Sequence, residues 1–108
     1  MENVGIAPPD TPVFTVLLMF DCPAAERDSL MDQFFAFIEE HMRSQPGFIS
    51  ALIYATEAGD KIVEHFQWRD RAAYESYRRS SQGKQAAEWL LSLQPQTYYL
   101  ELAHAIVA

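Results

Sequence analysis

Residues 46–68 read PGFISALIYATEAGDKIVEHFQW, and they carry the clearest indication of the fold. Two runs rich in β-branched and aromatic residues, 48–56 and 61–68, flank the short segment Glu57-Ala58-Gly59-Asp60. Gly59 can supply the positive φ that a tight turn needs, so the two runs are predicted to form a β-hairpin. Alternation along the paired strands then divides their side chains between two faces. One face is predicted to carry Ile49, Ala51, Ile53, Glu64, Phe66 and Trp68, and the other Tyr54, Val63, His65 and Gln67.

The segment before the hairpin is predicted to contain a strand and a long helix. Residues 13–20, VFTVLLMF, form an apolar run between Pro12 and Pro23 that is typical of a strand buried on both faces. Beyond Pro23, which suits the first turn of a helix, apolar side chains recur at spacings of three and four residues. This helix is predicted to end by Gln45-Pro46-Gly47.

Two short helices and a last strand are predicted after the hairpin. Asp70 can cap the first of these helices, and Ser80 or Ser81 can cap the second, which must end before Pro95. The closing segment, TYYLELAHAIV at residues 97–107, is predicted to be a strand. The order is therefore β-α-β-β-α-β, with the second helix divided in two.

This order favours a ferredoxin-like α+β domain, in which helices cover one face of a four-stranded antiparallel sheet. The helices can cover only one face, yet residues 13–20 offer no polar face to water. We therefore expect a homodimer that buries the other sheet face. The domain is predicted to span residues 13–108 and to follow an extended arm, residues 1–12, that contains three prolines.

Composition excludes several classes of function. The chain has 108 residues and a formal charge of −7, which argues against nucleic acid and anionic membrane surfaces as partners. No segment approaches the roughly 18 apolar residues of a membrane span, and the start lacks the features of a signal peptide. Cys22 is the single cysteine, and no metal-ligand spacing occurs. A cytoplasmic protein without a metal site is expected.

Glu64 is the residue with the most chemical promise. An apolar setting disfavours the charged form of a carboxyl group and brings its pKa towards the range that proton abstraction requires. Glu64 is therefore a candidate general base. The alternative is a carboxylate that is paired with Arg71 or Arg78, or that reaches water at the sheet edge.

Several aromatic and apolar residues are candidates for a substrate pocket. Trp68 and Tyr74 can form the walls of a site for a flat aromatic substrate, although core packing explains them equally well. The candidates for the pocket lining are Phe34, Phe37, Ile53 and Phe66. The cationic pairs nearby, Arg69 with Arg71 and Arg78 with Arg79, are interpreted as a solvated helix surface, with steering of anions towards the pocket as the alternative.

Residues 46–74 resemble the central block of the antibiotic biosynthesis monooxygenase family, which consists of small dimeric α+β-barrel proteins. The resemblance is carried by PGF before a strand, by the Gly-containing hairpin, and by a strand that ends in Trp68 before a short helix with Tyr74. The pattern of elements extends from Val13 to the end of the chain. The resemblance implies a dimeric α+β barrel.

Within that family, the chain is most similar to cofactor-independent oxygenases that convert polyketide anthrones to quinones. Their QW-x5-Y pattern, here Gln67-Trp68 and Tyr74, implies a pocket tryptophan and tyrosine. Two positions depart from the pattern, because Glu64 replaces a strand asparagine and Ala87 stands near the arginine of the last helix. The haem-degrading members add a first-strand asparagine and a helix histidine, and this chain has neither.

The resemblance therefore implies a monooxygenase that oxidises a small electron-rich aromatic, polyketide-like or quinol-like, with dioxygen as co-substrate and without a cofactor. Glu64 would be the base, and Trp68 and Tyr74 would position the ring. Two alternatives remain open. One is a non-catalytic dimer that binds a hydrophobic small molecule, and the other is a cofactor-free isomerase or cyclase that needs only proton transfer by Glu64.

Overall fold

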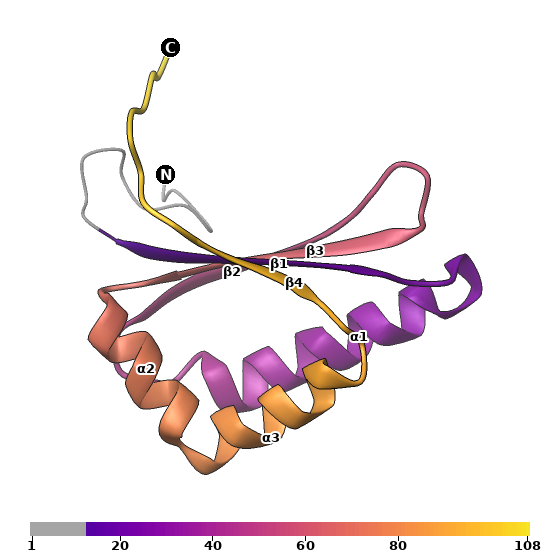
Figure 1. Cartoon of the computed structure of the whole chain (residues 1–108), viewed down its shortest axis with the longest axis horizontal. Helices are drawn as coiled ribbons and strands as arrows, with labels where there is room; N and C mark the ends of the chain where they lie inside the picture. The colour runs from indigo at the N-terminus through magenta and orange to yellow at the C-terminus, as the bar shows by residue number, and fades with distance from the viewer. Residues whose placement is uncertain (1–12) are drawn as a thin grey trace.

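The structure, a computed structural model, describes residues 13–108, so the proposed arm at residues 1–12 lies outside the described residues. Strands and helices follow one another in the predicted order (Figure 1). The elements are β1 (Phe14–Asp21), a 3-10 turn (Ala24–Glu26), α1 (Arg27–Phe37), a π-helical turn (Ile38–Met42), β2 (Phe48–Ala55), β3 (Lys61–Trp68), α2 (Arg71–Arg79), α3 (Ser81–Leu91) and β4 (Gln96–Leu100).

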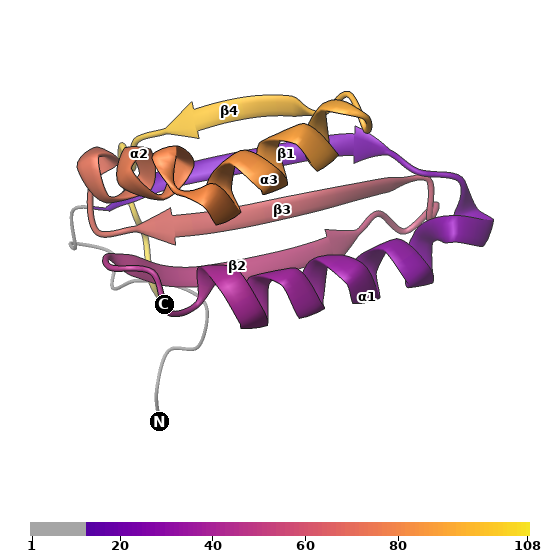
Figure 2. The ribbon, with the colours of Figure 1, turned by 90° about the horizontal axis from the view of Figure 1, so that it is seen from below.

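The four strands form one antiparallel sheet in the order β2-β3-β1-β4. All three α-helices lie on the same side of this sheet (Figures 1 and 2). The predicted ferredoxin-like α+β fold is confirmed, including the division of the second helix into α2 and α3. The long first helix is continuous from Arg27 but changes from α to π geometry at Ile38.

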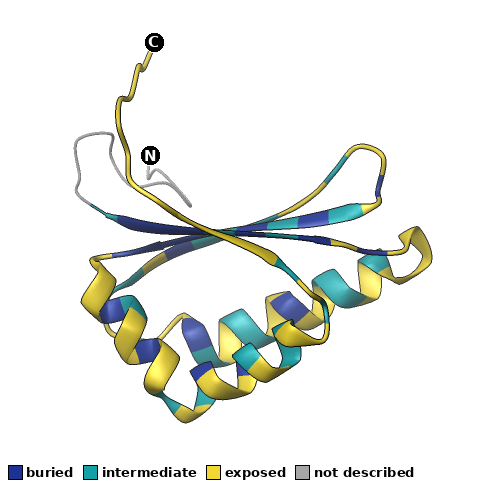
Figure 3. Ribbon diagram, viewed as in Figure 1, coloured by how far each residue is buried: buried dark blue, intermediate teal, exposed yellow. Residues whose placement is uncertain are grey.

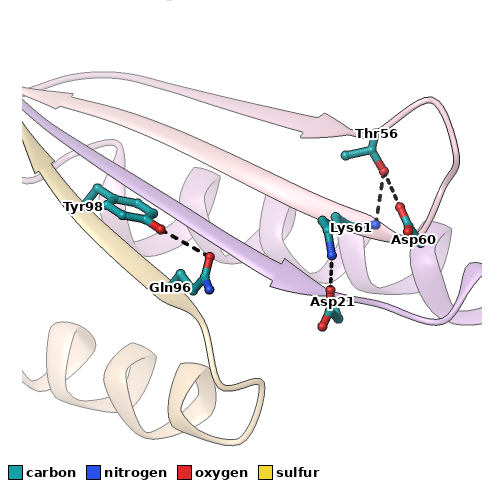
Figure 4. Close-up of polar contacts among 6 residues, drawn as sticks. All are labelled: Asp21, Thr56, Asp60, Lys61, Gln96 and Tyr98. Carbon is teal, nitrogen blue, oxygen red and sulfur yellow. Dashed lines mark hydrogen bonds and ion pairs between the residues drawn. The ribbon is translucent and has the colours of Figure 1, made fainter.

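The β2–β3 turn is held by local polar contacts, as Figure 4 shows. Gly59 has φ +74° and donates its N–H to the Thr56 carbonyl oxygen at 2.8 Å. The Thr56 hydroxyl donates to an Asp60 carboxylate oxygen at 2.9 Å and accepts the backbone N–H of Lys61 at 3.2 Å. Lys61 in turn forms an ion pair with Asp21 at the end of β1. The predicted turn is confirmed, and these contacts join it to the neighbouring strand.

The predicted register of the hairpin is correct from Ser50 to Ala55 and wrong at Ile49. A bulge between Phe48 and Ser50 brings Phe48, rather than Ile49, opposite Trp68. Ile49 is consequently exposed, while the Phe48 ring packs edge-on against the Trp68 indole at 5.5 Å. The bulge inserts one residue and shifts the alternation of the strand, because side chains on a strand have a period of two.

The last strand is shorter than predicted, since β4 ends at Leu100 and residues 101–108 form no strand. Leu100 pairs with Thr15, one residue from the beginning of β1. The residues that follow therefore run beyond the end of their neighbouring strand and lack its ladder hydrogen bonds. In Figure 1 this segment leaves the sheet on the side away from the helices.

The core lies between the sheet and the helices, where the buried positions gather in Figure 3. Helix-facing side chains of β1 and β3, such as Val16 and Trp68, are almost fully buried. On the opposite face, which is predicted to meet a second subunit, Leu17 and Met19 of β1 are only half-buried in the single chain. The sheet therefore has one buried face and one face that remains partly open.

Candidate functional site

A cavity of about 360 Å³ lies between the helix-facing side of the sheet and the helices. This volume falls within the range of small-molecule sites in proteins, about 300–1,000 Å³. The sheet contributes side chains from β1, β3 and β4, and every α-helix contributes to the opposite wall. The lining residues are Val16, Leu18, Phe34, Phe37, Ile38, Met42, Glu64, Phe66, Trp68, Tyr74, Tyr77, Arg78, Gly83, Ala86, Ala87, Trp89, Leu90, Leu91, Pro95, Thr97 and Tyr99.

Aromatic rings surround the cavity at two ends. At one end, Trp68 stacks on Tyr77 with ring centroids 5.3 Å apart and meets Tyr74 edge-on at 6.0 Å. At the other, Trp89 of α3 contacts Phe34 and Phe37 of α1 at 4.7 and 6.1 Å. Such rings present both apolar faces and hydrogen-bonding edges, which suits a flat aromatic ligand.

The N-terminal caps of α2 and α3, and the close contact between the two helices at Gly83, fix where they lie over the sheet. Asp70 accepts the backbone N–H of Ala73 at 2.8 Å, and Ser80 accepts that of Gly83 at 3.0 Å, so both predicted capping roles are confirmed, with Ser80 rather than Ser81 at the second position. A Cβ on Gly83 would lie 2.0 Å from the Tyr77 carbonyl oxygen. A glycine at this position therefore lets α3 begin against the end of α2, and both helices reach the cavity.

Glu64 is 1% exposed and lines the cavity from the sheet side. It stands on β3 between Leu18 of β1 and Ile53 of β2. Its Oε2 atom is buried and has no hydrogen-bond partner among residues 13–108. Burial, which penalises the charged form, raises the pKa of Glu64 to about 8.

The alternative in which Glu64 pairs with an arginine is wrong for the described residues, because neither Arg71 nor Arg78 contacts its carboxyl group. The Arg71 guanidinium instead lies over the Phe14 ring, 4.6 Å from its centroid. Arg78 donates from Nη1 to the Tyr74 hydroxyl at 2.9 Å. Glu64 does not reach water at the sheet edge either, since β3 is a central strand.

Two tyrosines of α2 face the cavity with differing partners. The Tyr74 hydroxyl accepts the Arg78 hydrogen bond, and burial raises the pKa of Tyr74 to about 12. The Tyr77 hydroxyl is buried without a hydrogen-bond partner in the described part of the chain, and burial also raises the pKa of Tyr77 to about 12. Both phenols are therefore neutral hydrogen-bonding groups at physiological pH.

Six of the seven predicted site residues meet at this cavity. Ile53 does not line it, because its side chain packs towards the cluster that contains Phe20 and Ile62. The six that line the cavity are Phe34, Phe37, Glu64, Phe66, Trp68 and Tyr74.

Sequence reasoning missed the other fifteen lining residues, which include Tyr77, Arg78, Trp89 and Tyr99. Arg78 is predicted to lie on a solvated helix surface, with steering of anions towards the pocket as the alternative. In the structure its side chain is exposed and also lines the cavity. Its spacing of four residues from Tyr74 places both side chains on one side of α2, and this spacing was the signal available in the sequence. The Ala87 side chain lies at the cavity as well.

Within the described residues, no group of three or more His, Cys, Asp or Glu side chains is arranged to hold a metal ion. None of the helices in residues 13–108 has the length and apolar character required to cross a bilayer.

Residues 13–89 match the model of a family described as antibiotic biosynthesis monooxygenase. Among curated proteins, the chain is 24% identical over 101 residues to the tetracenomycin-F1 monooxygenase of Streptomyces glaucescens, covering 93% of this chain and 90% of the relative.

Solved structures share the fold. The monooxygenase from the ActVA-Orf6 gene of Streptomyces coelicolor, in complex with nanaomycin D, has a TM-score of 0.73 at 24% identity, covering 91% of this chain and 94% of that one. A conserved protein from Methanosarcina mazei has a TM-score of 0.71 at 15% identity, over 83% and 92% of the two chains. A haem-degrading protein from Mycobacterium tuberculosis has a TM-score of 0.67 at 10% identity, over 92% and 100%.

Proposed function

The chain belongs to the antibiotic biosynthesis monooxygenase family, and from this premise we propose that it is a cofactor-independent monooxygenase of a small electron-rich aromatic. The observation that carries the proposal is the unpaired, buried carboxyl of Glu64 inside an aromatic-walled cavity. The proposed substrate is an anthrone or hydroquinone, polyketide-like or quinol-like, and dioxygen is the co-substrate. The relatives named for tetracenomycin F1 and found with nanaomycin D support this substrate class.

The proposed chemistry needs one base and an apolar site. For an anthrone, Glu64 removes a proton from the CH2 group and leaves a delocalised carbanion that is rich enough in electrons to react with dioxygen. Addition of O2 and return of the proton give a hydroperoxide, which loses water to form the ketone. The balance is CH2 plus O2 to C=O plus H2O, so oxygen is the only oxidant.

Glu64 suits this role in one protonation state only. With its pKa raised to about 8, most of the carboxyl is protonated at pH 7, and the ionised fraction that can accept a proton grows as the pH approaches 8. Trp68 and Tyr74, from β3 and α2, would position the ring against this carboxyl.

A second candidate function, a non-catalytic binder of a hydrophobic small molecule, is favoured by one observation. Ala87 lines the cavity near the place where the family resemblance implies an arginine, so α3 supplies no cation there. A cofactor-free isomerase or cyclase would also use Glu64 but would consume no oxygen.

Oxygen uptake separates these functions. We expect metal-chelated, flavin-free protein to consume oxygen saturably with a panel of anthrones and hydroquinones, faster at pH 8.5 than at pH 6.5. Loss of the base in Glu64→Gln should lower uptake by about 100-fold or more, and Trp68→Phe should weaken it through altered ring packing. Glu75→Gln, on the exposed side of α2, is the matched control and should behave as wild type.

Equal uptake by Glu64→Gln and wild type would remove Glu64 from the mechanism. Ligand binding without any uptake would favour the binder. Conversion of a bound compound at the same rate with and without oxygen would favour the isomerase or cyclase.

The proposed partner is a second copy of the chain, bound through the sheet face opposite the helices. One row of side chains, Tyr98, Leu17, His65 and Leu52, crosses all four strands on this face. Tyr98 is 44% exposed, and the buried His65 Nδ1 has no hydrogen-bond partner in the part of the chain that the structure describes. An apolar face with an unsatisfied polar atom fits an interface.

We place this dimer in the reducing cytoplasm, in line with the single, unpaired Cys22.

A further inference from the structure

Arg78 differs from the other charged residues near the cavity. It is the single cation among the lining residues of the described chain. Its Nη1 atom donates to the Tyr74 hydroxyl at 2.9 Å, and its guanidinium carbon lies 5.8 Å from the centroid of the same ring. Arg27, Arg43 and Arg69 each have a carboxylate partner. Arg71, Arg79 and Lys84 have none among the described residues, but they do not line the cavity. No carboxylate among residues 13–108 pairs with Arg78, so the positive charge at the cavity is not neutralised within the described protein.

The position of Arg78 is at the solvent side of the cavity. The lining residues with exposed side chains come from the end of α2, the end of α3 and β4. Tyr99 of β4 stands beside Tyr74, with ring centroids 5.8 Å apart, and the Arg71 guanidinium carbon lies 5.6 Å from the Tyr99 ring centroid. We call Arg71, Tyr74, Arg78 and Tyr99 the cationic rim. An anionic group that enters here meets the Arg78 guanidinium and two phenol hydroxyls, whereas the Arg71 guanidinium lies behind them, against the rings of Phe14 and Tyr99.

The distribution of charge along the chain also favours an anionic group at the cationic rim. The formal net charge is −7, yet the segment from Arg69 to Lys84 carries five of the eight Lys and Arg residues and only Asp70 and Glu75 as acids. Local positive charge of this kind raises the concentration of anions at a nearby site. Glu64 inside the cavity does not repel an anion strongly at pH 7, because burial raises the pKa of Glu64 to about 8 and keeps its carboxyl group mostly neutral.

We propose that Arg78, assisted by Tyr74, binds a carboxylate on the aromatic ligand, so that the ring enters the apolar cavity with its anionic substituent held at the cationic rim. A guanidinium pairs with a carboxylate through two parallel N–H···O bonds, which orients as well as attracts the ligand. The ligand class is thus an aromatic carboxylate. The inference builds on the proposed function for its ring system, but the binding step itself requires no reaction with oxygen.

The test compares two ligands that differ in one charge. Calorimetric titration of the full chain with anthraquinone-2-carboxylate and with the neutral anthraquinone-2-carboxamide should give at least about tenfold tighter binding of the carboxylate. Arg78→Gln should abolish the preference, and Arg78→Lys should restore part of it. Arg79→Gln removes a charge from the next position, which does not line the cavity, and should keep the preference. Thermal unfolding of each variant checks that the fold is intact.

Three results would overturn the inference: equal binding of the two ligands by wild type, failure of both to bind, or equal loss of preference in Arg78→Gln and Arg79→Gln. The oxygen assay keeps this inference distinct from the proposed function. A carboxylate preference without oxygen uptake supports the inference and removes the oxygenase, whereas uptake without a preference removes the inference alone. Where uptake occurs, Arg78→Gln should raise KM for the carboxylated anthrone about tenfold and leave kcat within about twofold.

Discussion

Glu64 has the least favourable surroundings of any acidic residue in the described chain. It is 1% exposed, its Oε2 atom has no hydrogen-bond partner in residues 13–108, and its strand neighbours across the sheet are Leu18 and Ile53. A buried polar group without a partner costs free energy of folding. Glu64, the proposed base, therefore lowers the free energy of unfolding, and the size of this effect depends on pH.

We predict that wild type loses stability as the pH rises from about 4.5 to about 8. In this window the folded protein holds a proton on Glu64 that the unfolded chain has released, because the pKa of Glu64 is raised from 4.5 to about 8. Each pH unit then lowers the free energy of unfolding by about 1.4 kcal/mol through this one group. Glu64→Gln cannot ionise, so the difference in stability between variant and wild type should widen in favour of the variant with rising pH.

Urea unfolding at pH 5, 6.5 and 8 measures this difference. Glu75→Gln is the control, because Glu75 is exposed on α2 and does not line the cavity. If the stability of wild type and of Glu64→Gln changed equally with pH, the pKa of Glu64 would not be raised in the folded protein.

The junction between α2 and α3 positions the cavity residues that these two helices contribute. Only Ser80 separates the two helices, and its hydroxyl both accepts the Gly83 N–H at 3.0 Å and donates to the Tyr77 carbonyl oxygen at 2.6 Å. Tyr77 and Arg78 approach the cavity from one side of this junction, and Ala86 and Ala87 from the other. The geometry of the site therefore depends on how closely the two helices meet.

Gly83→Ala should destabilise the protein by about 1–3 kcal/mol, the usual cost of forcing an extra carbon into a packed region. The added Cβ would stand 2.0 Å from the Tyr77 carbonyl oxygen, so α3 must move away from α2. Thermal unfolding measures the loss. Lys84→Ala, at the next and exposed position, is the control and should change stability by less than about 0.5 kcal/mol. Equal melting temperatures for the two variants would show that the junction tolerates a side chain.

At the scale of the whole molecule, the two faces of the sheet have different environments. The helices cover one face and enclose the cavity, whereas Tyr54 and Tyr98 on the other face are 51% and 44% exposed. Exposed apolar surface on a sheet is a common site of association. The chain after Leu100 continues past this face with Leu102, Ile106 and Val107 also exposed.

We predict that light scattering at micromolar concentration gives twice the chain mass of 12.3 kDa. Leu52→Glu places a charge beside His65 in the row that crosses the sheet, and burial of that charge in an interface should shift the mass towards that of a monomer. Gln33→Glu adds the same charge on the exposed surface of α1 and should remain dimeric. A folded wild-type monomer at this concentration would contradict the proposed interface.

The amino-acid sequence alone predicts the order of the elements, the hairpin turn at Gly59, the cap at Asp70, a second cap at Ser80 or Ser81, and six residues of the cavity. These depend on turn geometry, capping and side-chain periodicity, which act over a few neighbouring residues.

Four features become visible only in the folded chain: the bulge at Ile49, the end of β4 at Leu100, the exclusion of Ile53 from the cavity and the place of Arg78 at its rim. The unpaired state of Glu64 belongs to the same group. Each depends on distances between segments far apart in the chain, because burial and hydrogen-bond partnership are properties of the packed molecule rather than of a local pattern.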